Sequence, residues 1–233
     1  MLYYKEVGNR SGKPIFFIHG GFTNHKTFEK QFSILSEYRC MFVDLPNCGE
    51  SRGFPEFTFD TAIDQTAELI EKITGEKKVI LIGHSYGGLV VKGLLERIPE
   101  RIEKAVIGST NLRKSPMYRL YTSLPGAFLT WMRNREYYQK EQISFRLIYE
   151  TQKSAWKHFT LPRWQGKKED FGKEIPILLL YAEKDIPDIQ KSMKLWKELL
   201  PHAQIKCFLG IGHAFFREHP ELVNPVVEAF VRE

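Results

Sequence analysis

A serine between two glycines, at the junction of a strand and a helix, is the feature that most constrains this chain. Gly83-His84-Ser85-Tyr86-Gly87 follows the apolar run at residues 79–82 and opens the helical pattern Tyr86–Arg97. The glycines allow a sharp strand-to-helix turn, which raises the Ser85 hydroxyl above the edge of a sheet. A helix N-terminus there favours negative charge that develops on a substrate. The pattern alone also fits a structural serine in a tight turn, so the argument depends on the rest of the chain.

Short apolar runs alternate with longer amphipathic stretches along most of the sequence. Strands are predicted at residues 15–18, 40–43, 79–82, 105–107, 177–181 and 205–208, with an antiparallel edge strand at residues 2–7. Helices are predicted near residues 26–35, 58–74, 86–97, 189–200 and 220–231. Most of the strands are continuous apolar runs, which indicates burial on both faces of the sheet. The alternation predicts an α/β fold with a doubly wound, mostly parallel sheet.

Residues 111–173 interrupt this alternation, between a strand that ends near Ser109 and a strand that starts near Ile175. The segment has no clear strand and is rich in aromatic residues. We interpret it as a helical insertion over the sheet, with residues 1–110 and 174–233 forming the core.

The basic charge of the chain belongs to the same segment. The whole chain has a formal net charge of +6, and residues 111–173 hold 13 Lys/Arg against 5 Asp/Glu. A solvated helical surface explains this composition, and so does an electrostatic landing site for an acidic partner. Nucleic acid is not expected as a partner, because no recognised nucleic-acid-binding motif is present.

Two glycines follow the predicted strand at residues 15–18, in His19-Gly20-Gly21-Phe22. They allow the backbone to turn an N–H toward a substrate oxyanion. The predicted donors are the amides of Phe22 and Tyr86, with Gly21 as the alternative to Phe22. We therefore predict that Gly20, Gly21, Phe22 and Tyr86 line the substrate site, and that His19 is a structural hydrogen-bonding residue.

A serine hydroxyl needs a base, and His213 is the candidate among seven histidines. It lies in Gly210-Ile211-Gly212-His213, after the last predicted strand, where ligand crevices form in open α/β sheets. His84 adjoins the serine, but its side chain is expected to point away. His25, His158 and His202 fit loop or surface positions, and His219 fits the surface of the last helix.

The acid that orients the base should follow a strand between the serine and the histidine. Asp185 has this position, after the strand at residues 177–181, and Glu183 and Asp188 are rivals. A carboxylate there would hold the imidazole tautomer and stabilise the imidazolium.

The order Ser85, Asp185, His213, with His19-Gly20-Gly21 upstream, resembles the α/β-hydrolase superfamily, in particular serine esterases and lipases with a helical lid. Asp44-Leu45-Pro46-Asn47-Cys48-Gly49-Glu50-Ser51 is similar to the D-x-x-G-x-G-x-S loop of that family, but Asn47 replaces its first glycine. The resemblance implies that residues 111–173 form the lid, which sets substrate choice.

The resemblance implies a carboxylesterase-like serine hydrolase that cleaves an ester or thioester through an acyl-enzyme on Ser85. The aromatic-rich segment at residues 111–173 suggests that the substrate has an apolar acyl or alcohol group. Ser85 argues against haloalkane dehalogenases and epoxide hydrolases, which use aspartate there. The alternatives are a C–C bond hydrolase or lyase on the same fold, an esterase of carrier-protein-linked acyl esters that docks through the basic lid, a lid-gated lipase, and a non-catalytic ligand-binding protein. No metal or organic cofactor is expected.

The remaining features point to the cytoplasm. No signal-peptide pattern is found at the start of the chain, and no run approaches the roughly 18 apolar residues of a membrane span. The cysteines Cys40, Cys48 and Cys207 are scattered and form no CxxC pair. We therefore expect a reducing compartment and neither a zinc site nor a disulfide framework.

Overall fold

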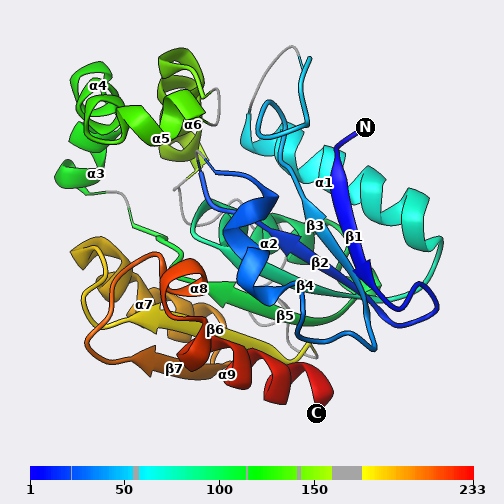
Figure 1. Cartoon of the computed structure of the whole chain (residues 1–233). Coiled ribbons are helices and arrows are strands. Elements are labelled where there is room, and N and C mark those ends of the chain that lie inside the picture. Colours follow the sequence, from blue (N-terminus) through cyan, green and yellow to red (C-terminus); the bar gives the residue numbers. More distant parts are fainter. Residues whose placement is uncertain (22, 55–57, 114, 141–142, 159–174) are drawn as a thin grey trace.

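A seven-stranded sheet runs through the molecule, and its topology confirms the predicted doubly wound fold (Figure 1). The structure, a computed structural model, describes residues 1–21, 23–54, 58–113, 115–140, 143–158 and 175–233. The strands are β1 Tyr4–Gly8, β2 Pro14–Ile18, β3 Arg39–Val43, β4 Val79–His84, β5 Ile102–Gly108, β6 Ile177–Ala182 and β7 Gln204–Phe208. They lie in the order β1-β3-β2-β4-β5-β6-β7. Strand β1 is antiparallel to β3, and the other neighbouring pairs are parallel.

Helices cover both faces of the sheet. Helices α1 Phe59–Thr74, α2 Tyr86–Arg97 and α7 Pro187–Leu199 pack on one face, whereas η1 His25–Gln31, α8 Phe215–Glu218 and α9 Pro220–Arg232 pack on the other. The short η2 Pro99–Arg101 joins α2 to β5. Because side chains alternate along a strand, Phe16 and Ile18 enter the first core while Ile15 and Phe17 enter the second. No helix among the described residues is long and apolar enough to cross a membrane.

The first predicted helix, at residues 26–35, differs from the structure. It is a 3-10 helix, η1, which ends at Gln31 and is followed by turns. Its buried residues are His25, Phe28 and Gln31. This spacing of three matches the three residues per turn of a 3-10 helix, but the backbone is kinked at Phe28 (φ −103°, ψ 19°), where two short helical turns meet.

Strand β7, like β1, is less buried than the five strands between them, so most of the strands are buried on both faces, as expected. It pairs only with β6 in the observed sheet, and Gln204, Ile205 and Lys206 are exposed. Ile205 has 40% of its surface accessible. Strand β7 lies at the edge of the sheet, and an exposed apolar edge strand promotes aggregation. The charged side chain of Lys206 opposes such aggregation.

Most of the described residues between β5 and β6 are helical. The helices are α3 Pro116–Tyr121, α4 Leu124–Arg133, α5 Arg135–Lys140 and α6 Phe145–His158. They enclose a small apolar cluster of Ala127, Tyr138, Ile143 and Ile148, against which Trp131, Tyr137, Phe145, Leu147 and Tyr149 pack. The predicted insertion at residues 111–173 extends beyond them, because residues 159–174 lie outside the described part. Its role as a lid stays a prediction.

The loop after β3 is organised around the buried carboxylate of Asp44. This carboxylate accepts hydrogen bonds from the amides of His25, at 2.6 Å, and Glu50, at 2.9 Å, and lies 2.9 Å from His25 Nδ1. The prediction that His25 occupies a loop or surface position was therefore wrong, because a buried carboxylate requires such partners. Gly49 has a φ of +50°, and a Cβ there would lie 2.2 Å from Asp44 Oδ2.

Asn47, which replaces the first glycine of the family loop, has a left-handed φ of +59°. Asparagine tolerates this conformation better than most residues. Its side chain also contributes two hydrogen bonds: Nδ2 donates to the Phe54 carbonyl at 2.9 Å, and Oδ1 accepts from the Phe54 amide at 3.1 Å.

We expect Asn47→Ala to lower the free energy of unfolding by about 2–3 kcal/mol, because both hydrogen bonds are lost and alanine disfavours a positive φ. Asn47→Gly loses the same bonds without the conformational cost, so its loss should be smaller by about 1 kcal/mol. Urea denaturation of the three proteins measures both differences. Equal losses for the two variants would contradict this account of the turn.

Candidate active site

The candidate nucleophile lies in a turn that only small residues permit. Strand β4 ends at His84 and helix α2 begins at Tyr86, so Ser85 alone makes the turn, with φ +55°. A Cβ on Gly83 would lie 2.5 Å from the Gly87 carbonyl oxygen, and a Cβ on Gly87 would lie 2.0 Å from the Ile18 carbonyl oxygen. Both glycines are therefore required by close backbone approach.

Hydrogen bonds from strand β5 and its following loop hold the turn in this strained conformation. The Ser85 amide donates to the Gly108 carbonyl at 2.7 Å, and Thr110 Oγ1 donates to the Ser85 carbonyl at 3.1 Å. Such contacts compensate for a left-handed serine, which costs on the order of 1–2 kcal/mol.

The structure brings together the three residues predicted to carry the chemistry. His213 Nε2 lies 3.0 Å from Ser85 Oγ, and His213 Nδ1 lies 2.8 Å from Asp185 Oδ1. A carboxylate only accepts hydrogen bonds, so Nδ1 carries the proton and Nε2 is left to accept from the serine hydroxyl. The Asp185 carboxylate is fully buried, whereas 33% of the His213 side chain is exposed.

Asp185 is held in place from three sides. Besides His213, it accepts hydrogen bonds from Ser109 Oγ and, at 2.7 Å, from the amide of Ile186. Burial by itself raises the pKa of a carboxyl group. The hydrogen bond and charge of His213, with the bonds from Ser109 and Ile186, more than offset burial and hold the pKa of Asp185 below its usual value. Asp185 is therefore ionised at neutral pH.

The rival acids have other partners. Glu183 accepts a hydrogen bond from the Gly210 amide at 2.8 Å, and Asp188 accepts one from Ser115 Oγ. His202 contacts the Ile175 carbonyl at 3.1 Å. Asp185 is thus the carboxylate that contacts His213 next to Ser85.

His84 is a functional candidate that the sequence argument missed. Its side chain was expected to point away from the site, but its Nε2 lies 2.8 Å from the carbonyl oxygen of His213. Its ring centroid lies 4.9 Å from that of His213, and the ring also packs against Phe215 and Phe216. Because a carbonyl only accepts, Nε2 of His84 carries the proton and donates it to the loop that holds His213.

Burial, together with the nearby charge of His213, lowers the pKa of His84 to about 3. His84 is therefore a neutral hydrogen-bond donor at ordinary pH. Its position directly before Ser85 was the available signal in the sequence.

The loop after β2 approaches Ser85, as expected for a contributor to the oxyanion site. A Cβ on Gly20 would lie 3.3 Å from Ser85 Cβ, and a Cβ on Gly21 would lie 3.7 Å from Tyr86 Cβ. Phe22, the predicted donor, lies outside the described residues. Strands β2 and β4 are neighbours in the sheet. The chain goes from β2 to β3 on one side and from β4 to β5 on the other, and ligand crevices occur at such switch points.

His19 forms hydrogen bonds that hold the same loop in place. Its Nε2 accepts a hydrogen bond from the Leu45 amide at 3.0 Å, so Nδ1 carries the proton and donates to the Gly20 carbonyl at 2.7 Å. Burial is the main cause that lowers the pKa of His19. A neutral, fully buried ring in these contacts has a structural role.

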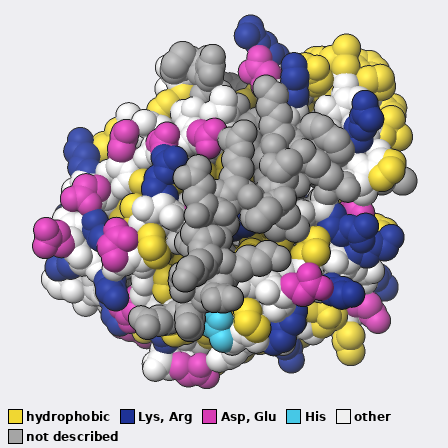
Figure 2. Space-filling view, turned by 180° about the vertical axis from the view of Figure 1, so that it is seen from behind, with side chains coloured by type: hydrophobic (Ala, Val, Ile, Leu, Met, Phe, Trp, Pro, Cys, Tyr) yellow, Lys and Arg dark blue, Asp and Glu magenta, His cyan; other side chains and the backbone are white. Residues whose placement is uncertain are grey.

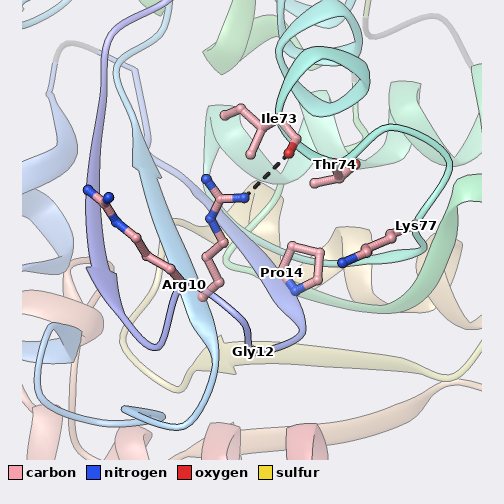
Figure 3. Close-up of a pocket in the computed structure, with 7 residues that line it drawn as sticks. Arg10, Gly12, Pro14, Ile73, Thr74 and Lys77 are labelled. Carbon is pink, nitrogen blue, oxygen red and sulfur yellow. Dashed lines mark hydrogen bonds between the residues drawn. The ribbon is translucent and has the colours of Figure 1, made fainter.

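A polar pocket lies at the opposite edge of the sheet, where β2 begins (Figure 3). It has a volume of about 50 Å³ and is lined by Arg10, Gly12, Pro14, Arg39, Ile73, Thr74 and Lys77. Arg39 donates to the Ile73 carbonyl at 3.4 Å and pairs with Glu6 at 3.0 Å. Basic groups near the last carbonyls of a helix are stabilising, so this pocket is explained as the capped end of α1.

Comparison with known proteins agrees with this fold. A family model described as "Alpha/beta hydrolase family" matches residues 15–226. The chain belongs to the α/β-hydrolase family. This α/β hydrolase is 25% identical over 260 residues to the AB hydrolase superfamily protein YisY of Bacillus subtilis (strain 168), and the match covers 98% of this chain and 94% of YisY.

Two further matches carry different descriptions. A cis-3-alkyl-4-alkyloxetan-2-one decarboxylase of Shewanella oneidensis is 22% identical over 275 residues, covering 100% of this chain and 85% of that protein. The solved structure of a lipase-esterase related protein from Clostridium acetobutylicum ATCC 824 matches with a TM-score of 0.80 and 21% identity, covering 99% of both chains. Membership supports hydrolase activity for this α/β hydrolase, while the bond that it cleaves has to be argued from its site.

We expect His84→Gln to flatten the dependence of stability on pH in acid. The pKa of His84 falls from 6.5 to about 3 on folding, so between these values the unfolded chain binds a proton that the folded chain does not. Stability due to this group is present above pH 6.5 and is lost as the pH falls, with a slope of at most about 1.4 kcal/mol per pH unit. Urea denaturation of both proteins between neutral and mildly acid pH measures the slopes, and identical slopes would contradict a neutral buried His84.

Proposed function

We propose that this α/β hydrolase cleaves a carboxylic ester or thioester through an acyl-enzyme on Ser85. The observation that carries the proposal is the continuous hydrogen-bonded chain from Ser85 Oγ through His213 to Asp185, at 3.0 and 2.8 Å. These distances are within the range of nucleophile activation by a neighbouring base.

Each member of this chain has a distinct task in the proposed reaction. Asp185 fixes the tautomer of His213, so that Nε2 is unprotonated and faces the serine hydroxyl. Ser85 Oγ attacks the substrate carbonyl as its proton moves to Nε2. The buried carboxylate then lies beside the imidazolium that forms and stabilises it.

The oxyanion of the tetrahedral intermediate would be held by two backbone amides. One is the amide of Tyr86, where α2 begins. The other would come from the loop after β2, with Phe22 as the predicted residue and Gly21 as the alternative. The Tyr86 amide lies at the switch point between β2 and β4, where the positive end of α2 favours negative charge.

The intermediate collapses when His213 returns its proton to the leaving alcohol or thiol. A water molecule then takes the place of the leaving group and loses its proton to His213 Nε2. Its attack on the acyl carbonyl releases the acid and restores Ser85. Every proton is transferred through one imidazole, and this sequence uses no metal or organic cofactor.

We expect an apolar substituent on the substrate, because the residue that follows Ser85 belongs to an apolar cluster. The ring of Tyr86 contacts Phe59 at a centroid distance of 5.9 Å, and Leu147 of α6 packs against the same core cluster. The aromatic side chains of the insertion carry less weight in this argument, because Trp131 and Phe145 pack within the insertion itself.

The first experiment is intact-protein mass after treatment with a fluorophosphonate, with p-nitrophenyl esters of graded chain length assayed in parallel. Wild type should gain one adduct and hydrolyse the esters. Ser85→Ala should gain none, and its kcat should fall by roughly 10⁴-fold or more, because the nucleophile is removed. A folded wild type with neither adduct nor turnover would refute the proposal and favour a ligand-binding protein on this fold.

Asp185→Asn and Asp188→Asn form a matched pair that tests the acid. We expect Asp185→Asn to lower kcat by about 10⁴-fold, because an amide can hold His213 in the wrong tautomer. Asp188→Asn should stay within a few-fold of wild type, since Asp188 accepts from Ser115 and contacts neither Ser85 nor His213. Steady-state kinetics on a p-nitrophenyl ester measures both. The reverse order of effects would assign the acid to Asp188.

A further inference from the structure

Helix α4 has its polarity reversed relative to an ordinary surface helix. Its buried residues are Gly126, Ala127 and Thr130. Its large apolar side chains are exposed: Leu124 by 54%, Phe128 by 50%, Leu129 by 67% and Met132 by 45%. Successive residues of an α-helix are separated by about 100°, so these four side chains and Pro125 occupy the face opposite the buried one. A surface helix normally turns its apolar face inward.

Close packing explains why the small residues face inward. A Cβ on Gly126 would lie 2.1 Å from the carbonyl oxygen of Leu120, so α3 and α4 approach each other at a point where only glycine fits. Thr130 Oγ1 donates to the Gly126 carbonyl at 2.9 Å, and Ala127 belongs to the insertion's apolar cluster. The orientation of α4 is thus held by its own contacts.

The four exposed apolar side chains of α4 share one face of the helix and therefore form a patch. Leu120, exposed by 60%, adds to the four side chains of α4, and we call these five residues the α4 patch. They account for five of the eleven large apolar side chains that are exposed in the described part of the chain, and the other six are scattered over the sequence. Figure 2 shows apolar side chains gathered at one corner of the molecule, with Lys and Arg beside them. Clustering of this kind marks an interaction surface.

The rim of the α4 patch is basic. From α3 to α5, residues 116–140 contain four basic residues and one acidic residue, Glu136. Arg119, Arg133, Arg135 and Lys140 are all exposed. The guanidinium of Arg135 lies 5.8 Å from the centroid of the Trp131 ring, at the edge of the apolar face of α4. A partner for this surface therefore has to be apolar at its centre and negatively charged around it.

We propose that the α4 patch and its basic rim bind an anionic lipid surface. An exposed apolar helix face flanked by Arg and Lys is the arrangement that inserts into the headgroup region of a bilayer. Binding to a second copy of this chain is disfavoured, because it brings the two basic rims together. The proposal does not depend on the activity proposed for Ser85.

Sedimentation of the full chain with lipid vesicles tests this proposal. Vesicles of phosphatidylcholine mixed with phosphatidylglycerol are compared with vesicles of phosphatidylcholine alone, at low and high NaCl. Wild type should bind the anionic vesicles at low salt at least about tenfold more strongly than the neutral ones, and added salt should weaken the binding. Absence of binding to anionic vesicles would overturn the proposal.

Variants locate the binding surface. Phe128→Ser with Leu129→Ser should weaken binding at least about tenfold, since two apolar groups are lost from the lipid contact. The matched control is Ile205→Ser with Leu222→Ser, two apolar residues exposed on β7 and α9, which should bind like wild type. Thermal melting shows that both proteins are folded. Equal binding by the two double variants would place the contact elsewhere and overturn the proposal.

Two further outcomes would assign the α4 patch to a protein instead of a lipid. Light scattering could show a dimer that Phe128→Ser with Leu129→Ser dissociates. An acidic carrier protein could bind wild type when vesicles do not. Either result would overturn the lipid proposal and leave the fluorophosphonate experiment unaffected.

Discussion

The candidate site depends on the close approach of helix α2 to strand β2. Gly87 lies so near the Ile18 carbonyl that a single added methyl group would come within 2.0 Å of its oxygen. This approach forces the chain to turn at Ser85 within one residue, and it puts the N-terminus of α2 beside the loop that follows β2. One steric constraint therefore positions both the hydroxyl and the amides that would act on a carbonyl.

Buried charge is the second constraint on the site. Asp185 is taken out of water, which is unfavourable for a carboxylate unless it is hydrogen-bonded. Ser109, Ile186 and His213 supply those bonds, and the donation from His213 determines the tautomer of its ring. His84 fixes the loop of His213 from the other side. The histidine is thus oriented by contacts from two segments, the end of β4 and the turn after β6, and not by Asp185 alone.

Local patterns in the sequence predicted the framework well. Continuous apolar runs predicted the parallel strands. The predicted bounds of α2 agree with the structure because glycines lie at its start and a proline follows its end. The same reasoning failed where the conformation or burial of a residue depends on a neighbour that is distant in the sequence. The segment at residues 26–35 is helical in periodicity, but its packing against the sheet favours a 3-10 helix. His25 is buried because the Asp44 carboxylate needs a partner, and Asp44 lies on another part of the chain.

The sequence by itself determined the fold class, the turn at Ser85 and the order of Ser85, Asp185 and His213, because these depend on periodicity and on backbone angles that few residues permit. Only the tertiary structure decided that Asp185 and not Asp188 meets His213, that His84 supports the base, and that α4 turns its apolar face outward. These choices depend on distances between residues far apart in the chain. Gly126 and the Leu120 carbonyl are close in the sequence. The buried face of α4 is complete only when residues of α6 also pack against Ala127, and the apolar face of α4 is then left exposed. Periodicity identifies an apolar face, and packing alone determines which way that face points.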